Sequence, residues 1–346
     1  MNCIFIDAFN PRYLKWTSYL KELSKENLHG NLEVTFGYTS IIASLVSGFY
    51  PEKHGVIDTF TLRKKPGFHI KNKYIASLAR LMTKNLFLYS PLQHEAAKYF
   101  EPSLKKIWPQ KNSLKVPTIF DTLEKKNKSF TFLDWPFIFN NRKASLFVQK
   151  STEATLRKAK TLKADFNWIH FLELDDIGHE HGIYSNVTKD AVRRIDEACQ
   201  ELDTKKMLFF SDHSMDMIEK RYDLEKELID LNLTYGKDFI YFIGSTFIRF
   251  WFKNSFAEAK VEDLLKGIKA GKIVDFKEYK LPKECDLIFL ANKGTVFYPN
   301  FFGKEQKAQH GWDPKQQKTF YMVKGLKGKK EIHVVDLMKK ALPLVK

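Results

Sequence analysis

Short apolar runs that alternate with helical patterns restrict the fold of this chain more than any other feature. Four of them read as buried strands: NCIFI, SFTFLDW, FNWIHFLEL and KKMLFFS. They are apolar almost throughout, as strands are when both faces of a parallel sheet are covered. Helical periodicity lies between them, most clearly over 116–128 and 188–206. The alternation predicts a doubly wound α/β core, with a mostly parallel central sheet and helices on both faces.

Two regions interrupt this alternation. Residues 58–112 are basic and aromatic, and we expect a helical insertion there that acts as a cap. Within it, residues 73–89 carry an apolar stripe with interleaved basic residues, which suits peripheral membrane contact or ordinary core packing. Residues 220–300 contain further strand-like runs, so we expect a small accessory sheet. A length of 346 residues accommodates one catalytic domain over 1–346 with both insertions.

The charge and the cysteines bear on partners and compartment. A net charge of +16 favours an anionic partner, although lysines spread along the whole chain also suit a plain solvated surface. Three widely spaced cysteines argue against a disulfide framework. The chain shows no signal-peptide pattern and no apolar run of about 18 residues. We therefore expect a cytoplasmic protein, at most peripheral at the inner membrane face.

Acidic and histidine side chains follow the predicted strands, the third of which we take to end at Leu174. In an open α/β sheet, ligands bind beyond the carboxyl ends of the strands. A single Asp after a strand is usually a helix N-cap, and a single His is usually an ordinary hydrogen-bonded group. The occurrence of such residues after several strands is what indicates a metal site. A late histidine in the glycine-bearing loop AQHGWDP joins the set. The candidate metal ligands are Asp7, Asp175, His179, Asp212, His213 and His310.

Mixed carboxylate and imidazole ligands suit Zn²⁺, with Mn²⁺ or Fe²⁺ as alternatives. Six ligands are too many for one tetrahedral ion but suit two divalent metals, which can clamp both oxygens of a phosphoryl displacement. Asp175 and His179 are four residues apart, so one helical turn presents both to one ion. Asp212 and His213 are adjacent, so a turn must direct both toward the same centre.

Four segments, in order, resemble the motifs of the type I phosphodiesterase and nucleotide pyrophosphatase branch of the alkaline phosphatase superfamily. They read SGFYPEKHG (47–55), LDDIGHEHG (174–182), SDHSM (211–215) and a late HG (310–311). Leu174 and Ser214 replace the family's proline and glycine, and neither exchange removes a ligand. The resemblance implies an alkaline phosphatase-like fold and a threonine-type nucleophile that bridges two metals. Carried over by motif, one metal is held by Asp175, His179 and His310, and the other by Asp7, Asp212 and His213.

Two threonines, Thr35 and Thr39, stand near the expected nucleophile turn. Family spacing falls on Tyr38, one residue before Thr39. We prefer Thr39, because Gly37 permits a sharp turn and Thr39 opens the helix TSIIASLVS, whose free N–H groups and dipole suit a phosphate. Thr39 could instead be a plain N-cap, with Thr35 or Ser40 as nucleophile. On the preferred interpretation Thr35 belongs to the preceding strand.

The residues around the nucleophile indicate the reaction. Monoesterases of the superfamily place an Arg directly after the nucleophile, where this chain has Ser40, and the sulfatase pattern is absent. The resemblance therefore implies a phosphodiester or pyrophosphate substrate, such as a nucleotide or a glycan phosphate, and a covalent phospho-threonine. Thr59 replaces the family's Asn that contacts a phosphoryl oxygen, so it is a candidate oxyanion contact.

Two other functions stay open. The sequence GYT before the helix is similar to a subgroup found beside polysaccharide-synthesis genes. This similarity suggests a phosphotransferase that moves a phospho-alcohol group onto a glycan or lipid-linked carrier. The third possibility is a basic protein that binds anionic lipid or nucleic acid without catalysis, which the complete ligand set disfavours. The sequence makes no prediction about oligomeric state.

Overall fold

A computed structural model describes the chain except for residues 67–97, 104–113, 134–145, 148–150, 304 and 346. The chain folds into two compact units. The first, which we call the sheet unit, comprises Met1–Ile57, Lys106–Met217 and Gln306–Lys346. The second, the accessory unit, comprises Asp58–Lys105 and Ile218–Glu305. The stretch 73–89 with its apolar stripe lies outside the described residues, and the single catalytic domain over 1–346 stays a prediction.

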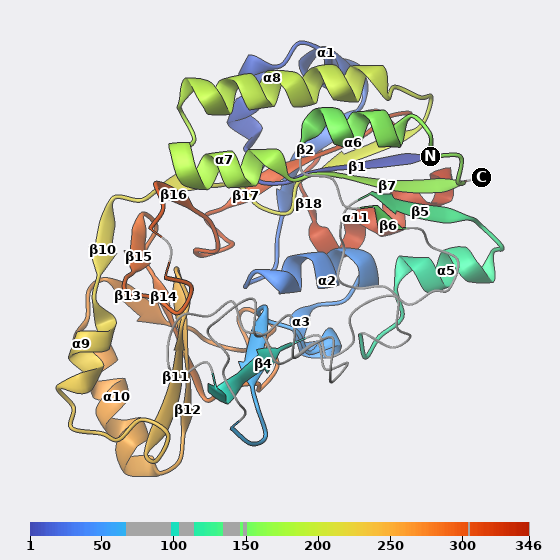
Figure 1. The fold of residues 1–346 in the computed structure, drawn as a ribbon. Coiled ribbons are helices and arrows are strands. Elements are labelled where there is room, and N and C mark those ends of the chain that lie inside the picture. Colours follow the sequence, from blue (N-terminus) through green and yellow to red (C-terminus); the bar gives the residue numbers. More distant parts are fainter. Residues whose placement is uncertain (67–97, 104–113, 134–145, 148–150, 304, 346) are drawn as a thin grey trace, which may run out of the picture. The chain divides into compact units, whose positions relative to one another are not determined.

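An eight-stranded sheet forms the centre of the sheet unit, in the order β18-β2-β17-β8-β1-β7-β5-β6 (Figure 1). Among these strands, β17 pairs antiparallel with β2 and β8, and the other pairs are parallel. The prediction of a mostly parallel sheet is therefore confirmed. The strands are β1 (Asn2–Ile6), β2 (Leu28–Glu33), β5 (Phe130–Leu133), β6 (Leu146–Phe147), β7 (Phe166–Phe171), β8 (Met207–Phe210), β17 (Lys318–Val323) and β18 (Ile332–His333).

Helices cover both faces of this sheet, as the alternation predicts (Figure 1). One face carries η1 (Pro11–Trp16), α1 (Tyr19–Glu26), α6 (Thr152–Ala159), α7 (Glu173–His181) and α8 (Asn186–Glu201). The other carries α2 (Thr39–Ser47), α3 (Pro51–His54), α5 (Ile119–Lys125) and α11 (Val334–Ala341), which η3 (Leu342–Leu344) follows. On the first face, Val192 and Ile195 of α8 are buried in one cluster with Ile4 of β1. This spacing of apolar residues at three to four positions is what docks an amphipathic helix on a sheet.

A smaller antiparallel sheet, in the order β11-β12-β14-β13, dominates the accessory unit. The strand-like runs within 220–300 do form strands here. The elements of this unit are β3 (Phe60–Leu62), β4 (Phe100–Pro102), β10 (Lys220–Tyr222), α9 (Leu224–Ile229), β11 (Phe239–Ile243), β12 (Phe247–Phe252), α10 (Ser255–Gly267), β13 (Gly271–Ile273), β14 (Leu287–Ala291) and β15 (Thr295–Phe297).

Two local predictions are wrong. The strand β7 ends at Phe171 rather than Leu174, and helix α7 begins at Glu173. Acidic residues in its first turn suit the positive end of the helix dipole, which explains the early helix start. Thr35 lies outside β2, which ends at Glu33, because the chain there already turns toward Gly37 and the Thr35 side chain bonds to helix α2.

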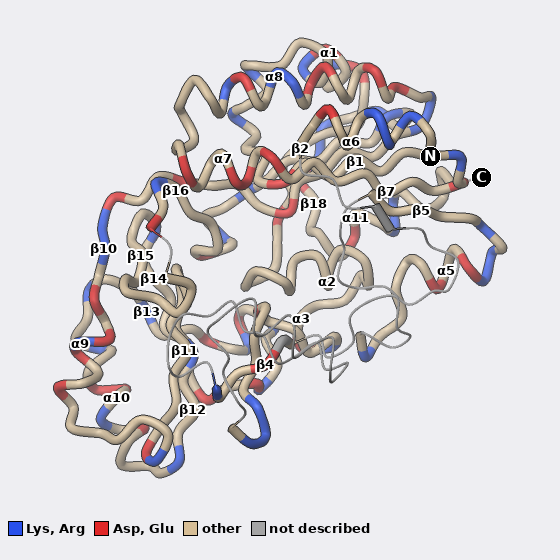
Figure 2. Tube along the Cα trace, viewed as in Figure 1, with Lys and Arg blue, Asp and Glu red and all other residues tan. Residues whose placement is uncertain are grey.

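The distribution of basic residues, the cysteines and the apolar helices bear on the expected partners and compartment. Lys and Arg are spread over helices and loops of both units rather than gathered in one segment (Figure 2). The three cysteines are free and buried. In the described part of the chain, no helix has both the length and the apolar character needed to cross a membrane.

Candidate metal centre

Topology explains why ligands far apart in sequence meet at one edge of the central sheet. Strands β1, β7 and β8 are parallel neighbours, so their carboxyl ends share an edge. Asp7 directly follows β1, α7 begins two residues after β7, and Asp212 stands two residues after β8. Because β17 runs in the opposite direction, the loop before it brings His310 to the same edge. All six candidate ligands belong to the sheet unit.

His213 lies at the centre of the cluster. Its Nε2 is 3.3 Å from Asp7 Oδ1, 3.4 Å from Asp212 Oδ2 and 3.8 Å from Asp175 Oδ1. The ligand atoms of Asp7, Asp212 and His213 all lie within 4.8 Å of one another, so these residues could hold one metal ion. This is the set that the motif resemblance assigns to one metal.

A second set of mutually close ligand atoms consists of Asp175, His213 and His310. The predicted set had His179 in place of His213. The ring of His310 stacks on that of His213 at 3.6 Å and 5°, which keeps these two imidazoles together. His179 is still near, with its Nε2 3.6 Å from Asp175 Oδ2. His213 thus adjoins both sets, and His179 approaches Asp175 from its other oxygen.

Main-chain contacts hold the ligands in place. His179 Nδ1 bonds to the carbonyl of Ala308 at 2.9 Å, which turns Nε2 toward Asp175. The carbonyl of His213 accepts hydrogen bonds from Ser211 Oγ at 2.8 Å and Thr319 Oγ1 at 3.2 Å. These two hydroxyls fix the predicted turn after β8, so Asp212 and His213 point to the same centre.

The electrostatics of the cluster fit a bound cation. Burial raises the pKa of Asp7 and Asp212 well above the usual carboxyl value, and like charge from neighbouring carboxylates raises it further. Burial also lowers the pKa of His213 to about 3 and that of His310 well below its ordinary value. The imidazoles are therefore neutral and do not balance the carboxylates.

Four buried atoms of this cluster have no hydrogen-bond partner within the described part of the chain. They are Asp7 Oδ1, Asp175 Oδ1, His213 Nδ1 and His310 Nδ1. Buried polar atoms are normally paired, so a group of unpaired ones needs an explanation. A divalent cation satisfies carboxylate oxygens and keeps them ionised, and mixed O and N donors suit such ions. The residues present fit the metals that the resemblance implies.

Helix α2 begins beside this cluster. Tyr38 is its N-cap residue, so Thr39 is the first helical residue rather than a plain N-cap, and it is 5% exposed. The ring of Tyr38 meets that of His310 edge-on at 5.2 Å, which places the helix start next to a candidate ligand. Gly37 has φ +96°, and a Cβ there would lie 2.1 Å from the carbonyl oxygen of Ile57. The turn therefore requires glycine, as predicted.

The other two candidate nucleophiles, Thr35 and Ser40, form side-chain hydrogen bonds near the start of α2. Thr35 Oγ1 donates to Ser44 Oγ at 3.2 Å, and Ser44 bonds to His54 Nε2 at 2.9 Å. Ser40 Oγ donates to the carbonyl of Phe36, four residues earlier and before the start of α2. These bonds give Thr35 and Ser40 structural roles, and the choice of Thr39 as nucleophile stays a prediction.

One residue beside the cluster was not predicted. His170 of β7 lies with its Nε2 3.0 Å from Asp7 Oδ2. The signal that could have found it is a polar residue inside the apolar run FNWIHF. The predicted oxyanion contact, Thr59, belongs to the accessory unit, where its N–H donates to Asp58 Oδ1 at 2.6 Å. Its role as oxyanion contact stays a prediction.

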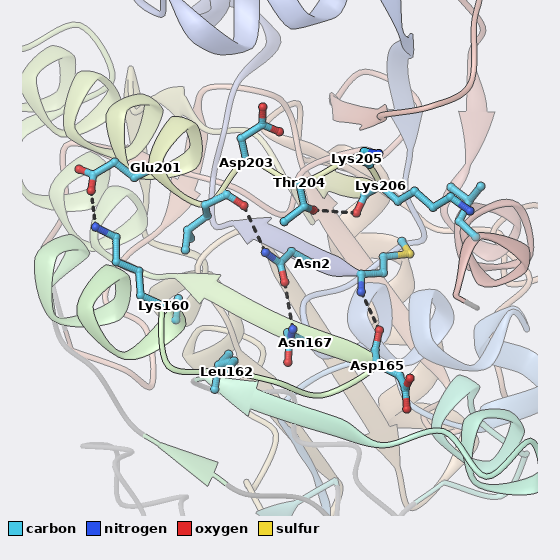
Figure 3. A pocket seen from close by; sticks show the side chains of 14 residues that line it. Asn2, Lys160, Leu162, Asp165, Asn167, Glu201, Asp203, Thr204, Lys205 and Lys206 are labelled. Carbon is cyan, nitrogen blue, oxygen red and sulfur yellow. Dashed lines mark hydrogen bonds and ion pairs between the residues drawn. The ribbon is translucent and has the colours of Figure 1, made fainter.

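A cavity of about 630 Å³ lies at the opposite edge of the sheet (Figure 3). Asn2, Asn167 and Lys206 line it, and each lies within one residue of the start of its strand, β1, β7 or β8. Two of its lining side chains are hydrogen-bonded: the Asn167 amide donates to Asn2 Oδ1, and the Asn2 amide donates to the carbonyl of Leu202 (Figure 3). None of the candidate ligands lines it, so we do not assign the chemistry to this cavity.

Comparisons with known proteins agree with this geometry. The family model "Type I phosphodiesterase / nucleotide pyrophosphatase" matches residues 3–313. Among solved structures, murine ectonucleotide pyrophosphatase/phosphodiesterase 5 is similar with a TM-score of 0.71 at 14% identity, covering 100% of this chain and 94% of that chain. Its inactive variant in complex with AMP is similar with a TM-score of 0.71 at 15% identity, with the same coverage.

A second kind of enzyme has the same fold. Phosphonoacetate hydrolase from Sinorhizobium meliloti 1021, in complex with phosphonoacetate, is similar with a TM-score of 0.71 at 11% identity, covering 100% of this chain and 95% of that chain. No curated protein matches the chain. At such low identities the solved structures show the fold alone, whereas the family model spans most of the sequence. On that match, this chain belongs to the type I phosphodiesterase / nucleotide pyrophosphatase family of the alkaline phosphatase superfamily.

Proposed function

We propose that this chain is a metal-dependent hydrolase of phosphodiester or pyrophosphate bonds, with Thr39 as its nucleophile. One observation carries the proposal. Three carboxylates and three histidines converge beside the start of α2, and several of their buried atoms have no hydrogen-bond partner in the described part. Such a cluster is poorly suited to stabilise a fold by itself and well suited to hold divalent cations.

The candidate ligands divide between two cations. Asp7, Asp212 and His213 would hold one, and Asp175, His179 and His310 the other. Zn²⁺ suits this mixture of oxygen and nitrogen donors best, with Mn²⁺ and Fe²⁺ as alternatives. Bound there, the cations would supply Lewis-acid charge that stabilises phosphoryl oxygens and favours the ionised threonine hydroxyl.

The chain's own residues account for the bond changes. Thr39 Oγ1 attacks phosphorus, and the bond from phosphorus to the leaving oxygen breaks, which gives a phosphoryl ester of Thr39. Water then cleaves that ester and restores the hydroxyl. The N-terminal end of α2, with its positive dipole end, would receive the phosphoryl oxygens. Ser40 follows the nucleophile, at the position where monoesterases of the superfamily have an Arg. Without that positive charge, a singly charged diester is favoured over a dianionic monoester.

A Thr39→Ala variant tests this proposal, with Thr35→Ala as its matched control. Both are assayed with Zn²⁺ on an aryl phosphodiester, on nucleotide sugars and on an aryl phosphomonoester. The AMP complex of the murine relative motivates the nucleotide compounds. We expect the diester rate to exceed the monoester rate, and Thr39→Ala to lose about 10³-fold or more, an effect of about 4 kcal/mol. Full activity of Thr39→Ala, or a metal-loaded wild type that cleaves none of these compounds, would refute the proposal.

Acid quenching separates hydrolysis from transfer. The reaction is run with a substrate that carries a label on phosphorus, and the labelled Thr39 peptide is counted after the quench. A hydrolase clears the Thr39 adduct with water, so little of this labelled peptide accumulates. A phosphotransferase toward a glycan or lipid-linked carrier would hold the adduct until an acceptor alcohol is added. We propose hydrolysis, because the family model that matches residues 3–313 is that of phosphodiesterases and nucleotide pyrophosphatases. A stable adduct that only an alcohol clears would favour the transferase.

A further inference from the structure

His170 lies in the middle of the central sheet, beside the candidate metal centre but outside the predicted ligand set. It is the fifth residue of β7 and pairs in register with Phe5 of β1. Its side chain is 1% exposed. The imidazole stacks on the ring of Phe5 at 3.8 Å and 8°. The strand backbone and this stacking therefore hold the ring in one orientation.

The surroundings of His170 give no packing reason for a polar residue. Phe5 also contacts Trp168 at 5.9 Å and Phe210 at 4.8 Å, so His170 stands in a layer of aromatic side chains. A phenylalanine ring is similar in size and avoids the burial of polar nitrogens. The imidazole must therefore be explained by a polar contact.

That contact is with Asp7. His170 Nε2 lies 3.0 Å from Asp7 Oδ2. When a cation keeps Asp7 ionised, its carboxylate can only accept, so the imidazole would be the donor. The other oxygen, Oδ1, has no hydrogen-bond partner in the described part and lies 3.3 Å from His213 Nε2. Asp7 is also held through its backbone, where its N–H donates to Phe171 O at 3.0 Å. The two carboxylate oxygens thus face different groups.

We infer that His170 is a positioning residue for Asp7, engaging Oδ2 so that Oδ1 is presented to the cation between Asp7, Asp212 and His213. Hydrogen bonds of this kind orient ligand carboxylates, and their loss typically costs 10–100-fold in metal affinity. The inference rests on the proposed function in one respect, namely that Asp7 is a metal ligand.

The test measures binding of Zn²⁺ to metal-free protein by competition with a chromophoric chelator, without any substrate. His170→Phe keeps the aromatic layer and removes the donor, His170→Gln keeps an N–H donor, and Phe5→Leu removes the stacking ring and keeps the imidazole. We expect His170→Phe to weaken Zn²⁺ binding at one of two sites by 10–100-fold. His170→Gln should recover most of that loss, and Phe5→Leu should bind Zn²⁺ nearly as wild type does.

The melting temperature of each metal-free variant separates positioning from a purely structural role. We expect metal-free His170→Phe to melt no lower than the metal-free wild type. The inference is overturned if His170→Phe binds both Zn²⁺ ions as tightly as wild type, or if Phe5→Leu weakens binding as much. Wild type that binds Zn²⁺ but cleaves no phosphodiester would instead refute the proposed function and leave this inference standing.

Discussion

Two clusters of buried carboxylates, one in each unit, compensate their negative charge in different ways. In the accessory unit, the fully buried Arg249 donates from Nη2 to Asp58 Oδ2 at 2.8 Å and from Nη1 to Glu284 Oε1 at 3.0 Å. In the sheet unit, Asp7 and Asp175 pair with histidines alone among the described residues. One cluster contains its own cation and the other does not.

The difference identifies which cluster is structural. Burial raises the pKa of Asp58, but the Arg249 charge opposes that rise and favours the ionised form. At the metal centre the only neighbouring bases among the described residues are imidazoles, and burial holds the pKa of His213 at about 3. Buried charge without a partner is unfavourable by several kcal/mol, so the carboxylates of the candidate metal centre would need a cation from solution to stay ionised. Removing the cation or its ligands from each cluster tests whether the two clusters differ in this way.

The largest effect is expected for Asp212→Asn. This change removes one carboxylate charge from the metal centre, where cations contribute several kcal/mol to the transition state. We expect kcat/KM on an aryl phosphodiester to fall about 10³-fold. Asp196→Asn is the control, since Asp196 is also buried but accepts from the N–H groups of Ser18, Tyr19 and Leu20. Equal activity losses in the two variants would show that burial, not metal binding, is what matters.

Arg249→Met should have the largest effect on stability. It leaves Asp58 and Glu284 buried without their cation, which costs roughly 3–5 kcal/mol in the free energy of unfolding. Urea unfolding of the purified variant measures it. The double variant Asp58→Asn/Arg249→Met should recover part of the loss, because one stranded carboxylate is gone. A loss below about 1 kcal/mol would mean that Arg249 does not compensate these charges.

Metal removal should affect the candidate metal centre of the sheet unit and not the Arg249 cluster of the accessory unit. A cation at 100 times its Kd raises the free energy of unfolding by about 2.7 kcal/mol. When Zn²⁺ replaces a chelator, we expect one such increment for each proposed cation in the wild type and in Arg249→Met, and one increment fewer in Asp212→Asn. An equal increment in Asp212→Asn would locate the stabilising cation elsewhere.

The smallest effect concerns His54, an imidazole buried at the end of α3. Its Nδ1 accepts from Val56 N–H at 3.2 Å, and burial lowers its pKa from 6.5 to about 3. Below pH 6.5 the unfolded chain binds a proton that folded His54 does not. Its contribution to stability is therefore full above pH 6.5 and is lost at up to about 1.4 kcal/mol per pH unit as pH falls toward 3.

The difference between wild type and His54→Gln isolates this contribution. Unfolding free energies measured at pH 6.5 and 5.5 in chelator should fall more steeply for wild type, because the variant has lost this titrating group. Identical slopes would show that folded His54 takes up its proton as freely as the unfolded chain does.

Local pattern was sufficient for much of the fold and for the set of candidate ligands. The apolar runs predicted β1, β7 and β8, because a strand buried on both faces must be apolar along its whole length. The start of α2 at Thr39 followed from Gly37 and the apolar helix after it. Asp7 and Asp212 could be singled out because they closely follow strands of a parallel sheet.

Contacts between distant segments could be decided only by the tertiary structure. His213 adjoins both ligand sets, because a turn held by Thr319 of β17 and stacking on His310 set its position. His170 meets Asp7 through the register of β7 against β1, and neither residue's local sequence encodes that register. The sequence by itself determined which residues are chemically able to bind cations and phosphate. Which atoms face one another depends on strand order and packing, and these are properties of the whole folded sheet unit.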